Sequence, residues 1–189
     1  MGRAEVVEYQ PGWPARFVEL RDAYAAALDR AAVPVTAIEH VGSTAVPGLA
    51  AKPVIDVDVV IEADAVEAAV RALERIGFQR SAASGVPERV AFLTPERFRP
   101  SNTYVVTAGS LTLRNHVGVR DVLRADAALR DEYGAVKRRA AASAADIDAY
   151  LALKSAVLDR VLLRAGLSRE DRAAIAEANR AIAARGAQG

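Results

Sequence analysis

Hydrophobic positions in the first part of the chain follow two different periods. An apolar stripe at helical spacing predicts a helix over residues 14–32; its members are Phe17, Leu20, Tyr24 and Leu28. Runs rich in β-branched residues predict four strands, at 35–41, 54–61, 89–93 and 103–107. Between the second and third runs, a second helical stripe ends at Gly77 and predicts another helix.

From about Asn115 onward the apolar spacing is helical to the end of the chain. Ser168 and Asp171 are three residues apart and can form a capping box for a last helix over 169–185. Strands therefore gather before residue 108 and helices after it. This segregation favours the α+β class, with a mixed β-sheet, flanking helices and a helical C-terminal half. Because no repeat or linker divides the sequence, we expect one domain over residues 1–189.

Composition narrows the functional classes. The 189 residues are 52% hydrophobic and 26% charged, which is typical of a globular protein, and the net charge of +1 gives no field that would attract nucleic acid or an anionic membrane. The absence of cysteine excludes disulfides, thiolate zinc sites and cysteine nucleophiles. No stretch approaches the roughly 20 apolar residues of a membrane span, and the first residues lack the apolar core of a signal peptide. We expect a cytoplasmic protein without a membrane partner.

Asp56 and Asp58 interrupt an otherwise apolar predicted strand. Side chains two apart on a strand point to the same face, with Cα atoms roughly 6.5 Å apart. Two carboxylates on a nearly buried face repel each other and are costly to desolvate unless a cation neutralises them. A hard divalent ion such as Mg²⁺, shared with phosphate oxygens, would do so. The alternative is a strand end near solvent, where the aspartates pair with Lys52 or an arginine.

Gly42, Ser43 and Thr44 directly follow the first predicted strand. Glycine allows a tight turn and a close approach of the backbone to a ligand, and the amide and hydroxyl groups after it can bind phosphate oxygens. An ordinary strand-exit turn is the alternative. The segment is not a Walker A loop, because Gly42 and Gly48 enclose five residues where that loop has four.

Both features stand in a segment that resembles a known family. Residues 39–49 (EHVGSTAVPGL) and 51–58 (AKPVIDVD) are similar to the hallmark of the GrpB-like family, a divergent branch of the nucleotidyltransferase superfamily. Later stretches resemble the family as well: 9–13, 119–124, Tyr133 with Lys137, and Tyr150 with Lys154. The resemblance covers about residues 5–165, so the last helix, within 168–186, lies outside it.

The resemblance implies a nucleotidyltransferase-like fold in which the glycine-serine turn holds a nucleoside triphosphate. It also implies that Asp56 and Asp58 are catalytic and bind Mg²⁺ or Mn²⁺. Family members tend to carry a histidine on the strand after the metal pair, where other nucleotidyltransferases have a third carboxylate. Tyr104 stands at this position, and because a neutral phenol is a poor ligand for Mg²⁺ we expect one metal ion, or none until the nucleotide binds, rather than two.

Four cations are candidates for binding the phosphates of that nucleotide: Lys52, Arg120, Lys137 and Lys154. Tyr133 and Lys137 are four residues apart and share one helical face, from which the ammonium group could reach a triphosphate. For each cation the alternative is a solvated surface charge. His40 could also hydrogen-bond a phosphate, or serve as a structural histidine beside Glu39.

Three functions stay open. The first is metal-dependent transfer of a nucleotidyl group from a nucleoside triphosphate to a small acceptor or a protein, a reaction that depends mainly on positioning and electrostatics. The second is a binding module of the same fold that senses a nucleotide or a coenzyme A-like ligand, which the missing third carboxylate favours. The third is an interaction protein with salt-bridged aspartates. Nucleic acid is not an expected partner, because the basic run 137–139 has no interleaved aromatic residues.

Overall fold

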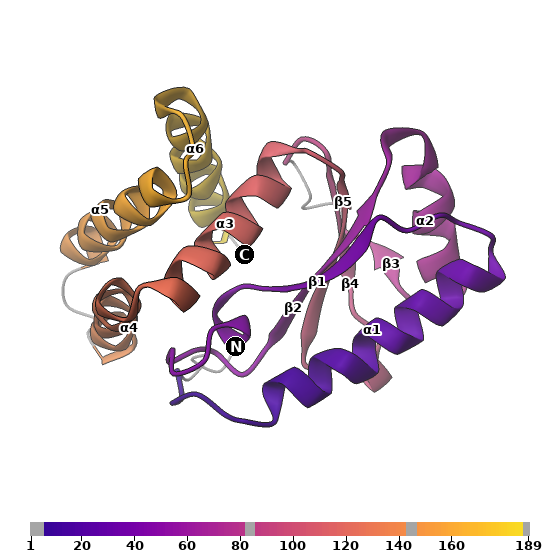
Figure 1. Ribbon diagram of the computed structural model, residues 1–189, viewed down its shortest axis with the longest axis horizontal. Helices are drawn as coiled ribbons and strands as arrows, with labels where there is room; N and C mark the ends of the chain where they lie inside the picture. Colours follow the sequence, from indigo (N-terminus) through magenta and orange to yellow (C-terminus); the bar gives the residue numbers. More distant parts are fainter. Residues whose placement is uncertain (1–5, 82–85, 143–146, 187–189) are drawn as a thin grey trace.

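The strands form one mixed sheet (Figure 1). In chain order they are β1 (Ala37–Val41), β2 (Ile55–Ile61), β3 (Gln79–Arg80), β4 (Arg89–Leu93) and β5 (Ser101–Thr107). Across the sheet the order is β1-β2-β5-β4-β3; the β2–β5 pair is parallel and the other pairs are antiparallel. This computed structural model describes residues 6–81, 86–142 and 147–186, and the side chains of 140–142, 147–154 and 182–186 lie outside the description.

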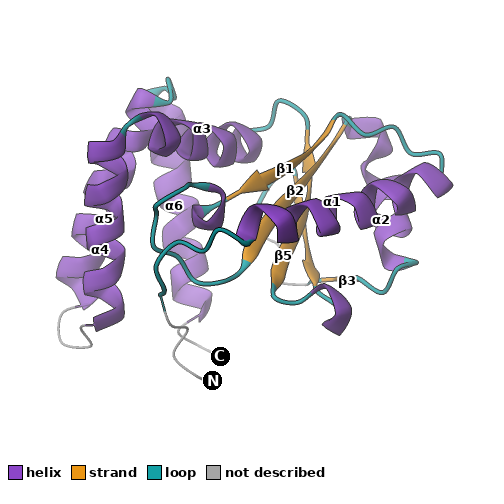
Figure 2. Cartoon of the chain, turned by 60° about the horizontal axis from the view of Figure 1, so that its bottom comes forward, coloured by secondary structure: helices purple, strands orange, loops and turns teal. Residues whose placement is uncertain are grey.

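Helices cover the two faces of the sheet unequally. They are α1 (Trp13–Arg30), α2 (Val66–Glu74), α3 (Leu111–Ala125), α4 (Ala127–Ala142), α5 (Ile147–Arg164) and α6 (Arg169–Gly186). The first two pack against one face of the strands, while α3 crosses the other face (Figures 1 and 2). The last three helices stand together at one end of the sheet.

The main core lies between the sheet and the layer of α1 and α2. Val57 and Val59 of β2 are fully buried there together with Leu20 of α1 and Leu73 of α2. Because side chains alternate along a strand, this core takes the odd-numbered residues of β2. The even-numbered residues, including both aspartates, are therefore turned toward α3.

A second hydrophobic core packs around the loop that follows β1. Val46 and Leu49 of this loop are buried among side chains of α3, α4 and α5 in one hydrophobic cluster. The members from the helices are Leu123, Leu129, Val136, Val157 and Val161. The loop is consequently held between the sheet and the C-terminal helices, which places α4 beside the end of β1.

The predicted α+β class, with a mixed sheet, flanking helices and a helical C-terminal half, is confirmed, while several boundaries differ. Helix α3 begins at Leu111 rather than near Asn115, because the Ser110 hydroxyl accepts a hydrogen bond from the Leu113 amide and caps its first turn. Strand β3 was not predicted, since it has two exposed residues whose only regular feature is pairing with β4. The predicted capping box is present, with Asp171 N donating to Ser168 Oγ at 3.0 Å.

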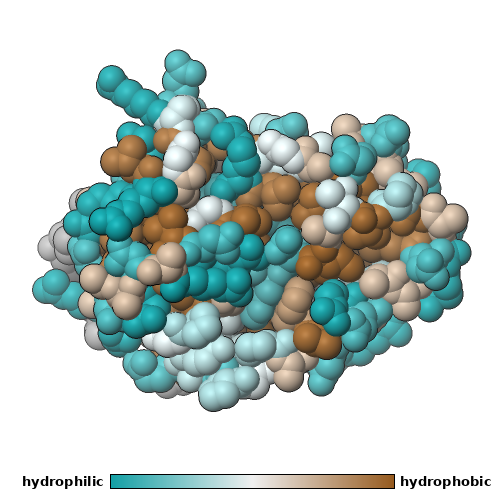
Figure 3. Space-filling model, viewed as in Figure 1, coloured by the Kyte–Doolittle hydropathy of each residue, from teal (hydrophilic) through white to brown (hydrophobic). Residues whose placement is uncertain are grey.

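A hollow of about 480 Å³ lies at the edge of the sheet, between β1, α3 and the turn that joins α5 to α6. Figure 3 shows apolar side chains at the surface in the strip between α3 and the strands. Among the described helices, none has both the length and the apolar character needed to cross a bilayer.

Candidate functional site

Asp56 and Asp58 lie on the α3 side of β2, and the strand register defines their neighbours. On the parallel strand β5, Asp56 is opposite Asn102 and Asp58 is opposite Tyr104. The Asn102 amide donates to Asp56 Oδ1 over 2.8 Å. On the antiparallel strand β1, Glu39 is opposite Asp58. Asp58 thus lies in the middle of a polar row that spans three adjacent strands, and Asp56 has a polar neighbour on β5.

Asp58 is fully buried, and its two oxygens differ in their contacts. Oδ2 lies 2.7 Å from Nδ1 of His116 on α3, so the imidazole nitrogen donates to the carboxylate. Oδ1 is buried and has no hydrogen-bond partner among the residues that the structure describes. A carboxylate oxygen buried in this way is costly unless a hydrogen-bond donor or a cation satisfies it. The position therefore favours a bound cation at Oδ1.

Gly42 brings the backbone against Asp56 at the end of β1. It has φ +70° and ψ −169°, a conformation that is essentially restricted to glycine, and it precedes a short 3₁₀ turn over Ser43–Ala45. A Cβ atom at Gly42 would lie 2.2 Å from Asp56 Oδ2, which no real side chain could tolerate. The glycine is thus required twice, by its backbone conformation and by its contact with the carboxylate.

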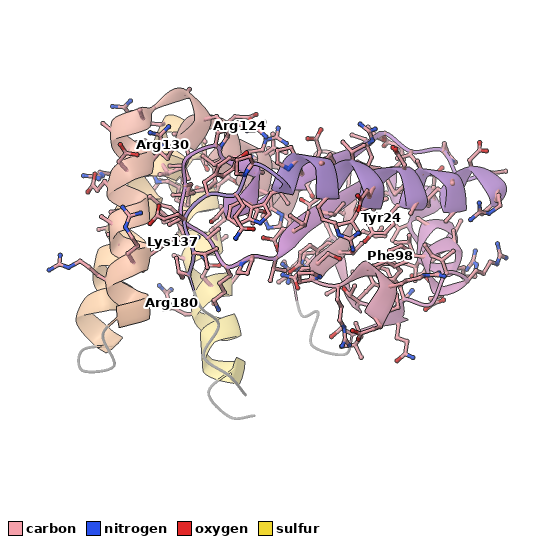
Figure 4. All side chains as sticks on the ribbon, turned by 90° about the horizontal axis from the view of Figure 1, so that it is seen from below. Tyr24, Phe98, Arg124, Arg130, Lys137 and Arg180 are labelled. Atoms are coloured by element: carbon pink, nitrogen blue, oxygen red, sulfur yellow. The ribbon has the colours of Figure 1, made fainter. Side chains whose placement is uncertain are left out.

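Lys137 of α4 lies beside the turn that contains Gly42 and Ser43. Its ammonium group donates to the Ser43 hydroxyl at 2.5 Å and lies 5.8 Å from the centre of the Tyr133 ring. Figure 4 shows Lys137, Arg124 and Arg130 coming from the helical side toward the loop after β1. Arg124 donates to the carbonyl of Ala45 in this loop. The glycine-serine turn therefore has a cationic flank on the side of the C-terminal helices.

Burial dominates the electrostatics of the carboxylates. It raises the pKa of Asp56, and the charge of Asp58 adds to this effect, while the Asn102 hydrogen bond and the charges of His116 and Lys137 oppose it. Burial also raises the pKa of Tyr104 to about 12, with further increases from the negative charges of both aspartates. The phenol therefore stays protonated, and an added cation would stabilise the charged form of Asp56.

The donor set fits a magnesium or manganese ion that is only partly held by protein. The described residues contain no group of three or more metal-ligating side chains. Asp56 and Asp58 offer two carboxylates, one with a buried oxygen that has no partner among the described residues. Mg²⁺ commonly binds to one or two carboxylates and completes its coordination with water and substrate phosphates. These two side chains could hold one ion, and Tyr104 adds no carboxylate.

His40 and Thr44 lie in a separate network behind the turn. His40 is buried, stacks on Phe17 with ring centres 4.8 Å apart, and bonds through Nε2 to Thr44 Oγ1 over 3.0 Å. Thr44 in turn donates to the carbonyl of Val54. Burial, aided by the charges of Arg124 and Arg120, lowers the pKa of His40 to about 4. A neutral histidine thus ties the turn to the start of β2.

The remaining candidate cations occupy different places. Arg120 of α3 donates from Nη1 to Glu39 Oε2 at 2.5 Å and to the His40 carbonyl at 3.1 Å, so it joins α3 to β1. Lys52 is exposed on the segment before β2. Lys154 belongs to α5, and its side chain lies outside the described part of the structure. Of the four cations, Lys137 is the one that the described contacts place at the glycine-serine turn.

Two residues of the site escaped the sequence analysis. The sequence analysis assigned a role to neither His116 nor Asn102. Both carried a signal: His116 is four residues before Arg120 on one helical face, and Asn102 is two residues before Tyr104 on one strand face. Both residues could have been identified from their spacing to Arg120 and Tyr104, which were already candidate site residues.

Comparison with known proteins identifies the family. The family model described as GrpB protein matches residues 3–164. The chain belongs to the GrpB family. A UPF0157 protein of Halalkalibacterium halodurans is 34% identical over 163 residues, which cover 85% of this chain and 81% of the relative. A UPF0157 protein of Deinococcus radiodurans is also 34% identical, over 87% of this chain and 84% of its own length. The matched region ends before α6, which lies outside it.

Solved structures show the same family and a wider fold relationship. The crystal structure of the conserved protein GrpB from Enterococcus faecalis matches this GrpB-family chain with a TM-score of 0.70 and 30% identity, covering 85% of this chain and 96% of that one. The Cid1 poly(U) polymerase bound to MgGTP matches with a TM-score of 0.51 and 16% identity, over 70% of this chain and 43% of Cid1. GLD-2 in its complex with RNP-8 matches with a TM-score of 0.52 and 17% identity, over 81% of this chain and 60% of the GLD-2 chain. The fold is nucleotidyltransferase-like.

Proposed function

We propose that this GrpB-family chain binds a nucleoside triphosphate with Mg²⁺ or Mn²⁺ and transfers the nucleotidyl group to a small acceptor or a protein. The observation that carries the proposal is the buried Asp58 oxygen, which has no partner in the described part of the chain and lies on the same strand face as Asp56. Such an arrangement is costly for the apoprotein and is relieved by a cation. The nucleotidyltransferase-like fold supports phosphate chemistry at this position.

The side chains divide the work in the proposed reaction. Ser43 and Lys137 hold the two outer phosphates of the nucleotide, where the ammonium charge stabilises the departing pyrophosphate. Asp56 and Asp58 hold the divalent ion, which when bound supplies charge neutralisation and orientation at the α-phosphate. His116 keeps Asp58 in position through Oδ2. An acceptor oxygen then forms a bond to the α-phosphorus, the bond to the pyrophosphate oxygen breaks, and the acceptor proton is released.

The arginines of the helical half support a small or protein acceptor rather than nucleic acid. Many of them are paired with acidic side chains: Arg114 with Asp171, Arg130 with Asp131, Arg138 with Glu8, Arg160 with Glu132, Arg164 with Asp126 and Arg172 with Asp159. Binding to a phosphate backbone depends on basic side chains that neutralise phosphates. Arginines that are neutralised by neighbours contribute little to such a surface.

Calorimetric titration with ATP, GTP, CTP and UTP, each with and without Mg²⁺, tests the proposal. We expect at least one nucleotide to bind in a Mg²⁺-dependent manner to the wild type and to Asp64→Asn, a control at an exposed carboxylate before α2. Asp56→Asn should abolish this binding while the protein stays folded. Equal nucleotide affinity of Asp56→Asn and the wild type would refute the role of the carboxylates.

The second candidate is a binding module that retains the fold without the chemistry. Tyr104 favours it, because this phenol stands opposite Asp58 where it cannot supply a third carboxylate. A pyrophosphate-release assay with the nucleotide that binds separates the two functions. Release of pyrophosphate that depends on Asp58 supports the transferase, and Mg²⁺-dependent binding without release supports the module.

A further inference from the structure

A second cation flanks the carboxylates on the side opposite to Lys137. Arg89 of β4 is opposite Val106 of β5, and Ala91 is opposite Tyr104, so these side chains share the sheet face that carries the aspartates. The Arg89 guanidinium carbon lies 4.7 Å from the centre of the Tyr104 ring. This is a cation–π contact, and it holds a cationic group beside the Tyr104 ring on the sheet face that carries the aspartates.

Tyr104 connects this cation to the carboxylates. It is opposite Asp58 in the register of β2 and β5, and its ring centre lies 6.2 Å from that of His116. The side chain is only partly buried. Its phenol hydroxyl can donate a hydrogen bond.

The strand order sets the spatial order of the polar side chains across the sheet. From the β1 side to the β4 side come the turn with Ser43 and Lys137, then the two aspartates of β2, then Tyr104 and finally Arg89. Phosphoryl and nucleotidyl transfer place the attacking and leaving oxygens roughly in line on opposite sides of the phosphorus. If the pyrophosphate leaves on the side of Lys137, the acceptor has to approach from the side of Tyr104 and Arg89.

We infer that Tyr104 and Arg89 form the acceptor subsite, and that the acceptor carries an oxyanion, a carboxylate or a phosphate, next to the hydroxyl that attacks. This inference rests on the proposed function, because it takes its direction from the assignment of Lys137 to the pyrophosphate. The guanidinium group binds the oxyanion through a pair of N–H donors, for which its geometry is suited. The acceptor hydroxyl then bonds to the α-phosphorus, its proton leaves to solvent, and pyrophosphate departs with the electrons of the broken bond.

Calorimetry with a non-reacting nucleotide tests the subsite. The protein is first saturated with Mg²⁺ and α,β-methylene-ATP, and inorganic phosphate and acetate are then titrated separately, so that the two oxyanions are distinguished. We expect at least one of them to bind to the wild type and, with the same Kd, to Arg71→Leu, a matched control on α2 at the opposite face of the sheet. Arg89→Leu should weaken this binding at least tenfold, and Tyr104→Phe, which removes only the hydroxyl, severalfold.

The outcomes separate the inference from the proposed function. Absence of Mg²⁺-dependent nucleotide binding to the wild type overturns both. If the nucleotide binds but neither anion does, or if the anion binds equally to wild type, Arg89→Leu and Tyr104→Phe, the acceptor subsite is wrong and the nucleotide site stands. An anion that competes with the nucleotide reports the triphosphate pocket and also overturns the subsite. Thermal melts verify that each variant is folded. If Arg89→Leu does not fold, the binding of the anions to Tyr104→Phe decides whether the acceptor subsite exists.

Discussion

His116 Nδ1 lies 2.7 Å from Asp58 Oδ2, and this hydrogen bond links two residues that are 58 positions apart in the chain. The contact fixes one oxygen of a fully buried carboxylate, while the other oxygen, Oδ1, has no partner within the described ranges of the chain. It also links α3 to the sheet, as does the contact between Arg120 and Glu39 one turn further along the helix. The imidazole therefore orients the carboxylate from the outside of the proposed metal site.

Removal of this contact should weaken the binding of the divalent ion. Groups that orient a metal-binding side chain typically contribute a factor of about 10 to 100 in affinity. We expect His116→Ala to raise the Mg²⁺ concentration needed for nucleotide binding by about that factor, as measured by titration of Mg²⁺ at a fixed ATP concentration. His116→Gln, which keeps a side-chain donor, should recover part of the loss.

The neighbouring substitution Asn115→Ala is the control, because it lies on the same helix about 100° away. It should leave the Mg²⁺ dependence unchanged. A Mg²⁺ requirement that is the same for wild type and His116→Ala would contradict the orienting role of the imidazole.

Gly42→Ala should destabilise the protein more than an ordinary glycine replacement. At Gly42 an alanine pays for a backbone conformation reserved for glycine and places its Cβ 2.2 Å from Asp56 Oδ2. Gly109 also has positive φ, +73°, but a Cβ there meets nothing within 4 Å. We expect Gly109→Ala to cost about 1 kcal/mol and Gly42→Ala about 3 kcal/mol or more in the free energy of unfolding. Urea denaturation measures both, and equal losses would show that the contact with Asp56 is absent in solution.

Asp56→Asn should raise the stability of the metal-free protein at neutral pH. Burial raises the pKa of Asp56 in the folded state, so the charged carboxylate opposes folding above that pKa and the opposition disappears as the pH falls. The asparagine carries no charge and keeps an oxygen that accepts from Asn102. Thermal melts without divalent ions should therefore give a higher Tm for Asp56→Asn than for wild type at pH 7, and equal values near pH 3. A lower Tm of the variant at pH 7 would contradict this account, and Asp64→Asn serves as the exposed control.

The parts of the fold and site that local sequence determines could be predicted. Alternation along a strand places Asp56 and Asp58 on one face whatever the rest of the chain does, and a capping box depends only on Ser168 and Asp171. The need for glycine at position 42 follows in the same way from a turn directly after a strand. Each of these features involves residues that are close in the chain.

The parts that depend on long-range packing could not be predicted. His116 reaches Asp58 only because the core formed by Leu123 and its neighbours sets the position of α3. Lys137 meets Ser43 across 94 positions for a similar reason. The register that brings Asn102 to Asp56 belongs to a parallel strand pair, whose connection contains α2, β3 and β4. No local pattern encodes such a register, because it is selected by burial of the odd-numbered residues of β2 against α1 and α2.

His40 should make the stability of the protein fall in mild acid. Its pKa is lowered by burial to about 4 in the folded state, whereas an exposed histidine in the unfolded chain titrates near 6.5. Between these values the unfolded chain binds a proton that the folded protein does not, so stability is complete above about pH 6.5 and is lost progressively toward pH 4. The full difference is about 3 kcal/mol, from 1.36 kcal/mol per unit of pKa. His40→Gln keeps a donor for Thr44 but cannot titrate, so urea midpoints at pH 7.5, 6 and 5 should fall more steeply for the wild type than for this variant. If the urea midpoints of the wild type and His40→Gln fall in parallel, His40 takes up a proton in the folded protein over the same pH range as in the unfolded chain. The bond to Thr44 would then not require a neutral ring.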